Sequence, residues 1–382
     1  MSLAKFNFPT PIHFGPGASK EVGEHLKAQG LKRPLIVTDQ GIAALPLLSS
    51  FMSSLHGLEV GVFAGVHGNP TGDQVMAGAV AYRVHNADCV IGLGGGAALD
   101  VAKVVGLLAT HPGDVIEYAW DHANVRLIEK ELPYFIALPT TSGTGSEVGR
   151  SSVISETDSH IKRVIFSPKI LAKAVFADPE LTLDLPAKVT AATGMDALTH
   201  NVESYLSPAY HPICDGIALE GVRIAATALP IAMRDGKNIQ ARSDMMMASM
   251  MGAIAFQKDL GATHSCAHAL GTVADMHHGL ANGIMIDHVM RFNKSAALEK
   301  FHVLAQIVGV DKAAKDASAD AFIAWLTQLK AQIGIPAKLG EVGVNNDHLD
   351  RLIAIAVPDI CHQTNPRPCT QDDFIRIFSE AF

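Results

Sequence analysis

Five histidines lie in one short stretch of the chain, between Gly261 and Phe292. They are His264, His268, His277, His278 and His288. Far upstream, Asp196 and His200 stand four positions apart, which is also the spacing of His264 and His268. Side chains four positions apart project from one face of a helix. Two helices that each carry such a pair could close around one divalent metal ion, and a site of imidazoles and one carboxylate can leave a coordination position open for chemistry.

A glycine-rich segment runs from Val90 to Lys103, with the sequence VIGLGGGAALDVAK. Glycines let the backbone approach a pyrophosphate closely, and the helix that follows offers unpaired N–H groups to the anion. Gly92, Gly94 and Ala97 satisfy the pattern G-x-G-x-x-A. Taken alone, the motif fits an ordinary tight turn between a strand and a helix equally well, because it does not follow the first strand of the chain.

Two further segments carry groups that suit a nucleotide. The loop PTTSGTGSEVG, residues 139–149, offers a row of hydroxyls to phosphate or ribose oxygens. Asp39 ends the first apolar run, where a carboxylate can accept both hydroxyls of an adenosine ribose. Each feature is also common in solvated turns. Open α/β folds bind ligands at the carboxyl ends of their strands, so the three loops together favour a dinucleotide.

The first half of the chain alternates short apolar runs with helical patterns. Strands are predicted at 34–39, 58–63, 88–95, 134–139 and 173–178, and helices at 72–85 and 99–109. Strands that alternate with helices predict a parallel sheet covered on both faces.

After Leu183 every periodic segment is helical. Helices are predicted at 187–206, 215–234, 238–256, 297–308, 316–332 and 371–382. At 382 residues the chain is long enough for two domains. We therefore predict an α/β dinucleotide-binding domain at 1–185 and an all-helical domain that binds the metal at 186–382.

Composition narrows the class of protein. Apolar residues make up 48% of the chain and charged residues 18%, and 30 Lys plus Arg against 38 Asp plus Glu give a net charge of -8. This balance argues against a nucleic-acid partner. The five scattered cysteines form no CxxC pair, so a reducing compartment is expected. The chain starts without a signal-peptide pattern, and Asp100 and Lys103 interrupt its most apolar stretch, so a cytoplasmic protein without a membrane span is predicted.

Together these segments resemble the iron-containing (group III) alcohol dehydrogenase family over nearly the whole chain. The matching segments are FGPGA at 14–18, Asp39, NPT at 69–71, GGGAALDVAK at 94–103, PTTSGTGSE at 139–147, DPELTLDLP at 178–186, GMDALTHNVESYLS at 194–207, HSCAHALG at 264–271, HHGLAN at 277–282 and NPRP at 365–368.

The resemblance implies a Rossmann-like N-terminal domain and a helical C-terminal domain, as in dehydroquinate synthase, with an active-site cleft between them. It also implies a divalent metal, usually Fe2+ and sometimes Zn2+, whose ligands here are Asp196, His200, His264 and His278. His268 matches a histidine near the metal, and we expect it to exchange protons with solvent. Asp39 matches a position associated with NAD preference. The other positions that match cofactor-lining residues are Gly95, Gly96, Ala97, Asp100, Thr140, Thr141, Thr144 and Lys162.

The chain departs from the family pattern in three places. Ala97 stands where serine is usual, which removes one hydroxyl contact to phosphate. His277 replaces a common proline and leaves the choice between His277 and His278 open, although Gly279 supports His278. Cys266 lies between two histidines, where a small or thioether residue is more usual.

Glu203, close to His200, is either a residue that orients a metal ligand or part of a helix surface.

The expected activity is hydride transfer between a small alcohol or aldehyde and NAD, with the metal as Lewis acid, in a homodimer. NADP and zinc remain alternatives to NAD and iron. Rival enzymes on the same fold are a zinc polyol dehydrogenase, a hydroxyacid dehydrogenase, a metal-free reductase of the maleylacetate type and a synthase of the dehydroquinate type. A metal or nucleotide sensor without catalysis is the alternative from another class. The sequence decides neither the substrate nor the physiological direction.

Overall fold

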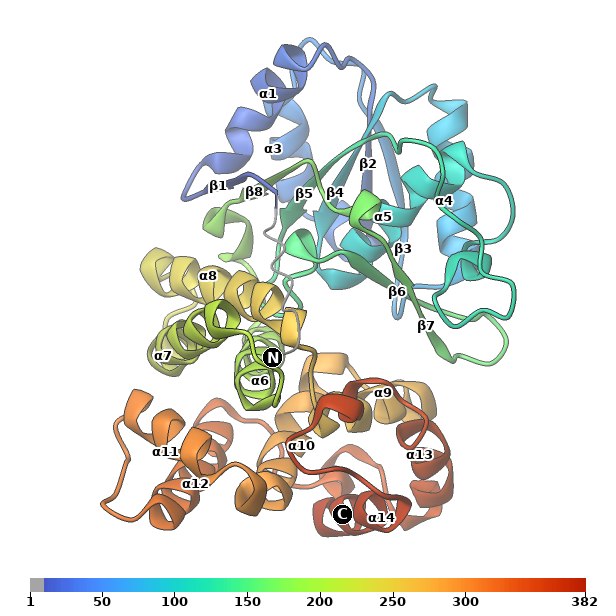
Figure 1. The fold of residues 1–382 in the computed structure, drawn as a ribbon. Coiled ribbons are helices and arrows are strands. Elements are labelled where there is room, and N and C mark those ends of the chain that lie inside the picture. The colour runs from blue at the N-terminus through green and yellow to red at the C-terminus, as the bar shows by residue number, and fades with distance from the viewer. Residues whose placement is uncertain (1–9) are drawn as a thin grey trace. The chain divides into compact units, whose positions relative to one another are not determined.

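The computed structural model describes residues 10–382, which form two compact units (Figure 1). Residues 10–141 and 145–183 make up the first, called here the sheet unit. Residues 142–144 and 184–382 make up the second, called here the helical unit.

The sheet unit is built on six parallel strands. In spatial order they are β1 (Ile12–Phe14), β8 (Ala174–Ala177), β5 (Tyr134–Pro139), β4 (Cys89–Gly94), β2 (Pro34–Asp39) and β3 (Gly61–Val66). Strands buried on both faces need apolar side chains at every position, and all six residues of β4 are buried. The parallel sheet predicted from the alternating pattern is confirmed.

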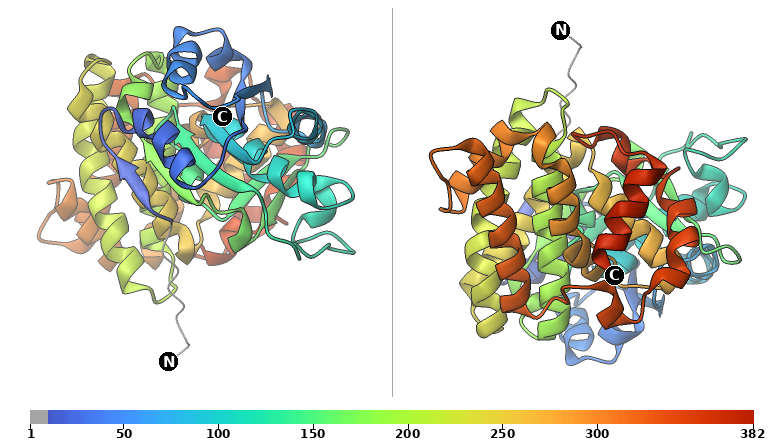
Figure 2. Two further views of the ribbon diagram at one scale, coloured as in Figure 1. Left: turned by 90° about the horizontal axis from the view of Figure 1, so that it is seen from above. Right: turned by 90° about the horizontal axis from the view of Figure 1, so that it is seen from below.

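Helices cover both faces of this sheet (Figure 2). Helices α1 (Val22–Ala28) and α3 (Pro46–Ser54) pack on the face that carries Ile91 of β4. On the other face, helix α5 (Gly96–Thr110) approaches so closely that a Cβ at Gly92 would lie 3.0 Å from the Cβ of Ala102. Helix α4 (Gly72–Val84) packs beside α5.

The sequence prediction differs from the structure at four strands. The strand expected at 58–63 lies at Gly61–Val66. Strand β1 was not predicted, because it has only three residues and none of them is buried. The antiparallel pair β6 (Ser151–Ser155) and β7 (Lys162–Phe166) was also missed, since its serines and basic residues resemble a loop.

The helical unit carries nine α-helices, and every regular element of residues 184–382 is helical. They are α6 (Ala187–Leu206), α7 (Pro212–Arg234), α8 (Ile239–Ala255), α9 (Ala262–Ala274), α10 (His278–Asn293), α11 (Leu298–Ile307), α12 (Lys315–Ile333), α13 (Leu349–Ala356) and α14 (Gln371–Ala381). Helix α6 lies at the centre, in contact with α7, α8 and α10, and all its residues from Thr190 to Leu206 are buried (Figure 2).

Helix α7 is long and apolar enough to cross a membrane if judged by length and composition alone. Its buried residues, among them Ala218, Val222 and Ala225, recur every three or four positions. This spacing gives the helix one buried face. Because α7 packs with α6 and α8, the pattern is that of a core helix in the helical unit.

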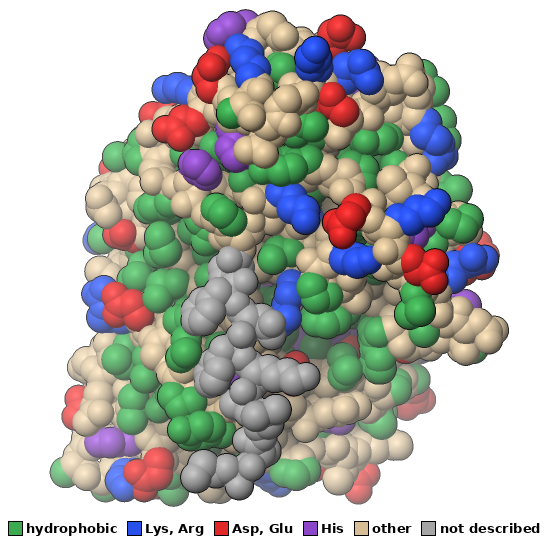
Figure 3. Space-filling view, turned by 45° about the horizontal axis from the view of Figure 1, so that its top comes forward, with side chains coloured by type: hydrophobic (Ala, Val, Ile, Leu, Met, Phe, Trp, Pro, Cys, Tyr) green, Lys and Arg blue, Asp and Glu red, His purple; other side chains and the backbone are tan. Residues whose placement is uncertain are grey.

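Charged side chains of opposite sign are interspersed on the face shown in Figure 3. Among the ion pairs of the sheet unit, Arg163 lies 2.6 Å from Asp121 and 2.7 Å from Glu156, and all three side chains are partly exposed. Exposed pairs of this kind contribute at most about 1 kcal/mol each to stability.

Candidate metal centre and dinucleotide site

Four side chains from three helices converge in the helical unit. Asp196 and His200 lie on successive turns of α6, His264 lies in the first turn of α9, and His278 begins α10. One ligand atom of each lies within 4.8 Å of the other three. From Asp196 Oδ1 the distances are 3.5 Å to His278 Nε2, 3.8 Å to His264 Nε2 and 4.0 Å to His200 Nε2.

These separations fit a divalent ion. Four ligands arranged tetrahedrally at 2.0–2.1 Å from zinc lie about 3.4 Å from one another. One carboxylate and three imidazoles suit both iron and zinc. Burial lowers the pKa of His200 to about 4, so this imidazole is neutral near pH 7, as a metal ligand must be.

The amide of Asn282 shows that the ligand atoms face a common point. Its Nδ2 donates to Asp196 Oδ1 at 2.7 Å and lies 3.3 Å from His264 Nε2 and 3.2 Å from His278 Nε2. An electropositive N–H group thus contacts three of the four ligand atoms. These three atoms therefore face one point, where a cation could take the place of the N–H group.

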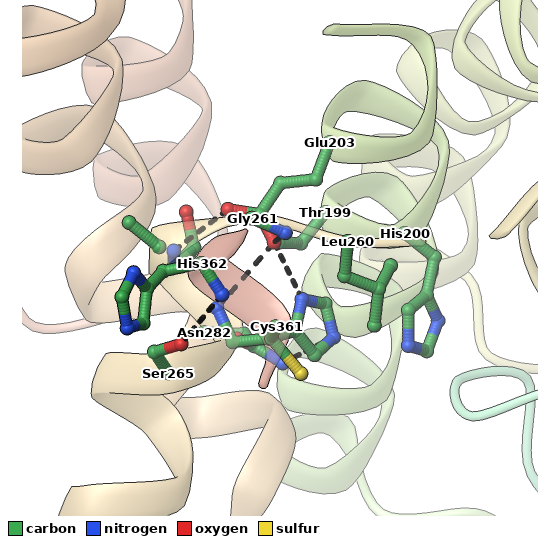
Figure 4. A network of polar contacts seen from close by, with 12 residues as sticks. Thr199, His200, Glu203, Leu260, Gly261, Ser265, Asn282, Cys361 and His362 are labelled. Carbon is green, nitrogen blue, oxygen red and sulfur yellow. Dashed lines mark hydrogen bonds and ion pairs between the residues drawn. The ribbon is translucent and has the colours of Figure 1, made fainter. Parts of the chain in front are cut away.

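Glu203 orients one of the imidazoles (Figure 4). Its Oε2 lies 2.7 Å from His264 Nδ1, and its carboxylate accepts the backbone N–H groups of Gly261 and Thr263. Burial alone would raise the pKa of Glu203, but the bonds to His264 and Thr263 outweigh burial and lower it. A carboxylate at Nδ1 leaves Nε2 as the ligand atom. Glu203 is therefore an orienting residue and not part of a helix surface.

Gly279 explains how His278 reaches the other ligands. A Cβ at Gly279 would lie 2.3 Å from the backbone oxygen of Ala192 on α6, so only glycine permits this approach of α10. His277 is exposed, whereas His278 joins the four-residue cluster. Of the two adjacent histidines, the structure brings His278 and not His277 to the other predicted ligands.

His268 does not share the metal cluster with His264, although the two stand four positions apart. Its Nδ1 lies 2.7 Å from Asp359 Oδ2, and its ring centroid lies 5.5 Å from that of His278. The picture of two helices that each supply a close pair of ligands is therefore wrong. Three helices supply the four residues, because His278 of α10 takes the place that local spacing suggested for His268.

Asp359 was missed by sequence reasoning. Besides His268, its carboxylate accepts the hydroxyl of Ser265 and the N–H of Cys361. Burial would raise the pKa of Asp359, but His268, Ser265 and Cys361 hold it well below its usual range. The only sequence signal was a carboxylate a few positions before the NPRP segment.

In the sheet unit, a cavity of about 330 Å³ lies at the carboxyl ends of β2, β3 and β4. It is lined by Asp39, Gln40, Gly41, Val66, His67, Gly68, Gly95, Ala97 and Ala98. Gly94 has φ +154°, and a Cβ there would lie 2.6 Å from the Cβ of Ala98 and 3.1 Å from Asp39 Oδ2. Glycine is thus required where the backbone turns from β4 into α5.

Three of the predicted cofactor residues, Asp39, Gly95 and Ala97, line this cavity. The others, which lie outside its lining, are Gly96, Asp100, Thr140, Thr141, Thr144 and Lys162.

Asp100 and the buried Lys103 hold the hydroxyl-rich loop at residues 139–149 in place. Ser146 donates to Asp100 Oδ1 at 2.5 Å, and Val153 N–H donates to Asp100 Oδ2 at 2.9 Å. Lys103 Nζ donates to Ser146 Oγ at 2.7 Å and to the carbonyl oxygen of Ser151 at 2.6 Å. These bonds tie α5 to the loop and to β6.

The chain is similar along its full length to known dehydrogenases. The family model described as iron-containing alcohol dehydrogenase matches residues 9–179, and the C-terminal model of the Fe-containing alcohol dehydrogenase family matches residues 190–382. A 4-hydroxybutyrate dehydrogenase of Cupriavidus necator is 38% identical, with 99% of this chain and 100% of that protein covered.

Solved structures agree with these matches. A 1,3-propanediol oxidoreductase superposes with a TM-score of 0.95 and 36% identity, with both chains fully covered. A sulfoacetaldehyde reductase of Bifidobacterium kashiwanohense, solved with NAD+, superposes with a TM-score of 0.88 and 29% identity over 100% of this chain and 99% of that chain. The chain belongs to the iron-containing alcohol dehydrogenase family.

Proposed function

We propose that this chain is a metal-dependent, NAD-linked oxidoreductase that transfers hydride between a small primary alcohol and nicotinamide. The observation that carries this proposal is the convergence of Asp196, His200, His264 and His278 within 4.8 Å of one another. Membership of the family supports it. We also propose that the nucleotide-binding and metal-binding roles divide between domains at 1–185 and 186–382.

In this proposal the four converging residues hold Fe2+ or Zn2+, and a bound ion supplies Lewis-acid polarisation of the substrate oxygen. Glu203 keeps Nε2 of His264 directed at the ion. Asp359 accepts the hydrogen bond from Nδ1 of His268, which leaves Nε2 of His268 able to exchange a proton with solvent or substrate. His268 is thus the proposed catalytic residue.

The cavity beside the glycine-rich turn is the proposed site of the adenosine end of NAD. The N-terminus of α5 offers N–H groups to the pyrophosphate, and Asp39 offers its carboxylate to the ribose hydroxyls. A second phosphate on that ribose, as in NADP, would meet the negative charge of Asp39. We therefore propose a preference for NAD. The cofactor-contacting residues proposed are Asp39, Gly95, Gly96, Ala97, Asp100, Thr140, Thr141, Thr144 and Lys162.

The substrate proposed is a short chain with a primary alcohol or aldehyde at one end and a second polar group at the other. The compounds in the names of three relatives all have two polar ends. These relatives are a 4-hydroxybutyrate dehydrogenase, a 1,3-propanediol oxidoreductase and a sulfoacetaldehyde reductase. We further propose a cytoplasmic homodimer without a nucleic-acid or membrane partner. The five cysteines form no CxxC pair, as is usual in a reducing compartment, and the net charge of -8 does not suit nucleic acid.

The test is a screen of 1,3-propanediol, 4-hydroxybutyrate, 1-propanol and the corresponding aldehydes with NAD or NADP. Protein stripped by a chelator and reloaded with one equivalent of iron or zinc is compared with the stripped protein. We expect metal-dependent formation of NADH, with faster turnover of the substrates that have two polar ends. Tight binding of NAD and metal without turnover of any of these compounds would instead identify a sensor.

A further inference from the structure

A second group of metal-ligand side chains lies beside the first in the helical unit. His268 of α9 stands near Asp359 and Cys361, which lie between α13 and α14. One ligand atom from each of the three lies within 4.8 Å of the other two. All three residues are partly exposed, so an ion in solvent can reach them. None of them belongs to the group formed by Asp196, His200, His264 and His278.

We propose that His268, Asp359 and Cys361 form a second cation site, selective for thiophilic divalent ions such as Zn2+ or Cd2+. Thiolate, imidazole and carboxylate are the three ligand types that zinc takes in proteins. Three protein ligands leave one position for water, which agrees with the partial exposure of the group.

The local hydrogen bonds already hold these ligands together. Asp359 Oδ2 lies 2.7 Å from His268 Nδ1, while Asp359 Oδ1 accepts the hydroxyl of Ser265 at 2.7 Å and the N–H of Cys361 at 2.9 Å. Ser265 in turn accepts the N–H of His362, so the segment that carries Cys361 is tied to α9 (Figure 4). Tetrahedral ligands at 2.0–2.1 Å from zinc lie about 3.4 Å apart, so the Asp359–His268 pair, now 2.7 Å apart, would have to open by about 0.7 Å to bind the ion.

The two groups of side chains differ in how soft their ligand atoms are. The four-residue group contains only nitrogen and oxygen donors, whereas the second contains a sulfur atom. Thiolates favour zinc and related soft ions and disfavour magnesium and manganese. An ordinary cysteine thiol, with a pKa of about 8.5, is protonated near pH 7, so formation of the sulfur–metal bond releases this proton to solvent. An ion bound to Nδ1 of His268 would shift the proton of that nitrogen to Nε2.

An ion at the second site would withdraw His268 from proton exchange, a consequence that rests on the proposed function. The first equivalent of zinc would then support turnover, and a second would inhibit it. Iron(II), which has less affinity for thiolate, would inhibit less.

The binding test uses the full-length protein loaded with one equivalent of zinc and titrated with Cd2+. Metal content is measured after removal of free ions, and thiolate-to-cadmium charge transfer is followed by near-ultraviolet absorption. We expect the absorption to rise and saturate at one cadmium per chain, with release of one proton. Mg2+ at the same concentration should produce no absorption and should not displace cadmium.

Cys361→Ser is the diagnostic variant, and Cys369→Ser is the matched control, because Cys369 is also partly exposed but lies outside the group. The absorption should be lost in Cys361→Ser and in Cys361→Ala and retained in Cys369→Ser. Retention in both Cys361 variants, or its absence from the unmodified protein, would overturn the proposal. These readouts need neither substrate nor turnover, so their failure is distinguishable from failure of the proposed dehydrogenase activity.

Discussion

At the residue scale, the proposed metal site includes only one of two adjacent histidines. His278 lies 3.5 Å from Asp196, while its exposed neighbour His277 is outside the cluster. We predict that His278→Ala lowers metal affinity by more than the roughly 10–100-fold that loss of an outer-shell partner costs, with a matching loss of turnover. His277→Ala should keep bound metal near one equivalent. Elemental analysis and NADH formation check both variants, and equal behaviour of the two would contradict the assignment.

A second prediction at this scale concerns Glu203, whose carboxylate contacts His264 but not the point where a metal ion would bind. Glu203→Gln keeps the shape but removes the charge opposite His264 Nδ1. We predict roughly 10–100-fold weaker metal binding in competition with a chelator. Glu220→Gln, on the exposed side of α7, is the control and should bind metal normally. Unchanged affinity in Glu203→Gln would show that this charge does not matter.

At the scale of elements, the contact between α6 and the start of α10 determines whether His278 reaches its partners. Gly279→Ala would place a Cβ 2.3 Å from the Ala192 carbonyl oxygen and force the helices apart. We predict a loss of roughly 1–3 kcal/mol in unfolding free energy, as for other overpacked sites, together with loss of metal. Gly216→Ala in α7 meets nothing within 4 Å and should gain about 1 kcal/mol. Urea unfolding of the two variants tests this contrast, and destabilisation of both would point to a general intolerance of alanine.

At the scale of the whole molecule, stability depends on pH through a buried acid of the sheet unit. Burial raises the pKa of Glu147 to about 7, from 4.5. Between these values the folded protein binds more protons than the unfolded chain, so this group makes the unfolding free energy fall as pH rises. We predict that Glu147→Gln gains up to about 3 kcal/mol relative to the unmodified protein between pH 4.5 and 8. Urea unfolding at both pH values measures the difference, and parallel pH profiles would contradict it.

Periodicity in the sequence predicted most of the elements that carry the site. The runs at 34–39 and 134–139 are strands β2 and β5, and the segment at 187–206 is helix α6. The hairpin of β6 and β7 escaped prediction, because its hydrogen bonds are made mainly between its own two strands and its residues lack an apolar alternation.

The sequence by itself determined most helices and strands, the residue types able to bind a metal, and the class of fold. It could do so because the period of apolar residues and the placement of glycines act over a few neighbouring positions. Only the tertiary structure decided that His278 joins Asp196, that Glu203 orients His264 and that Asp359 holds His268. The last two contacts link positions 61 and 91 apart along the chain. Such partners depend on how helices pack in space, and no spacing within a single helix encodes that packing.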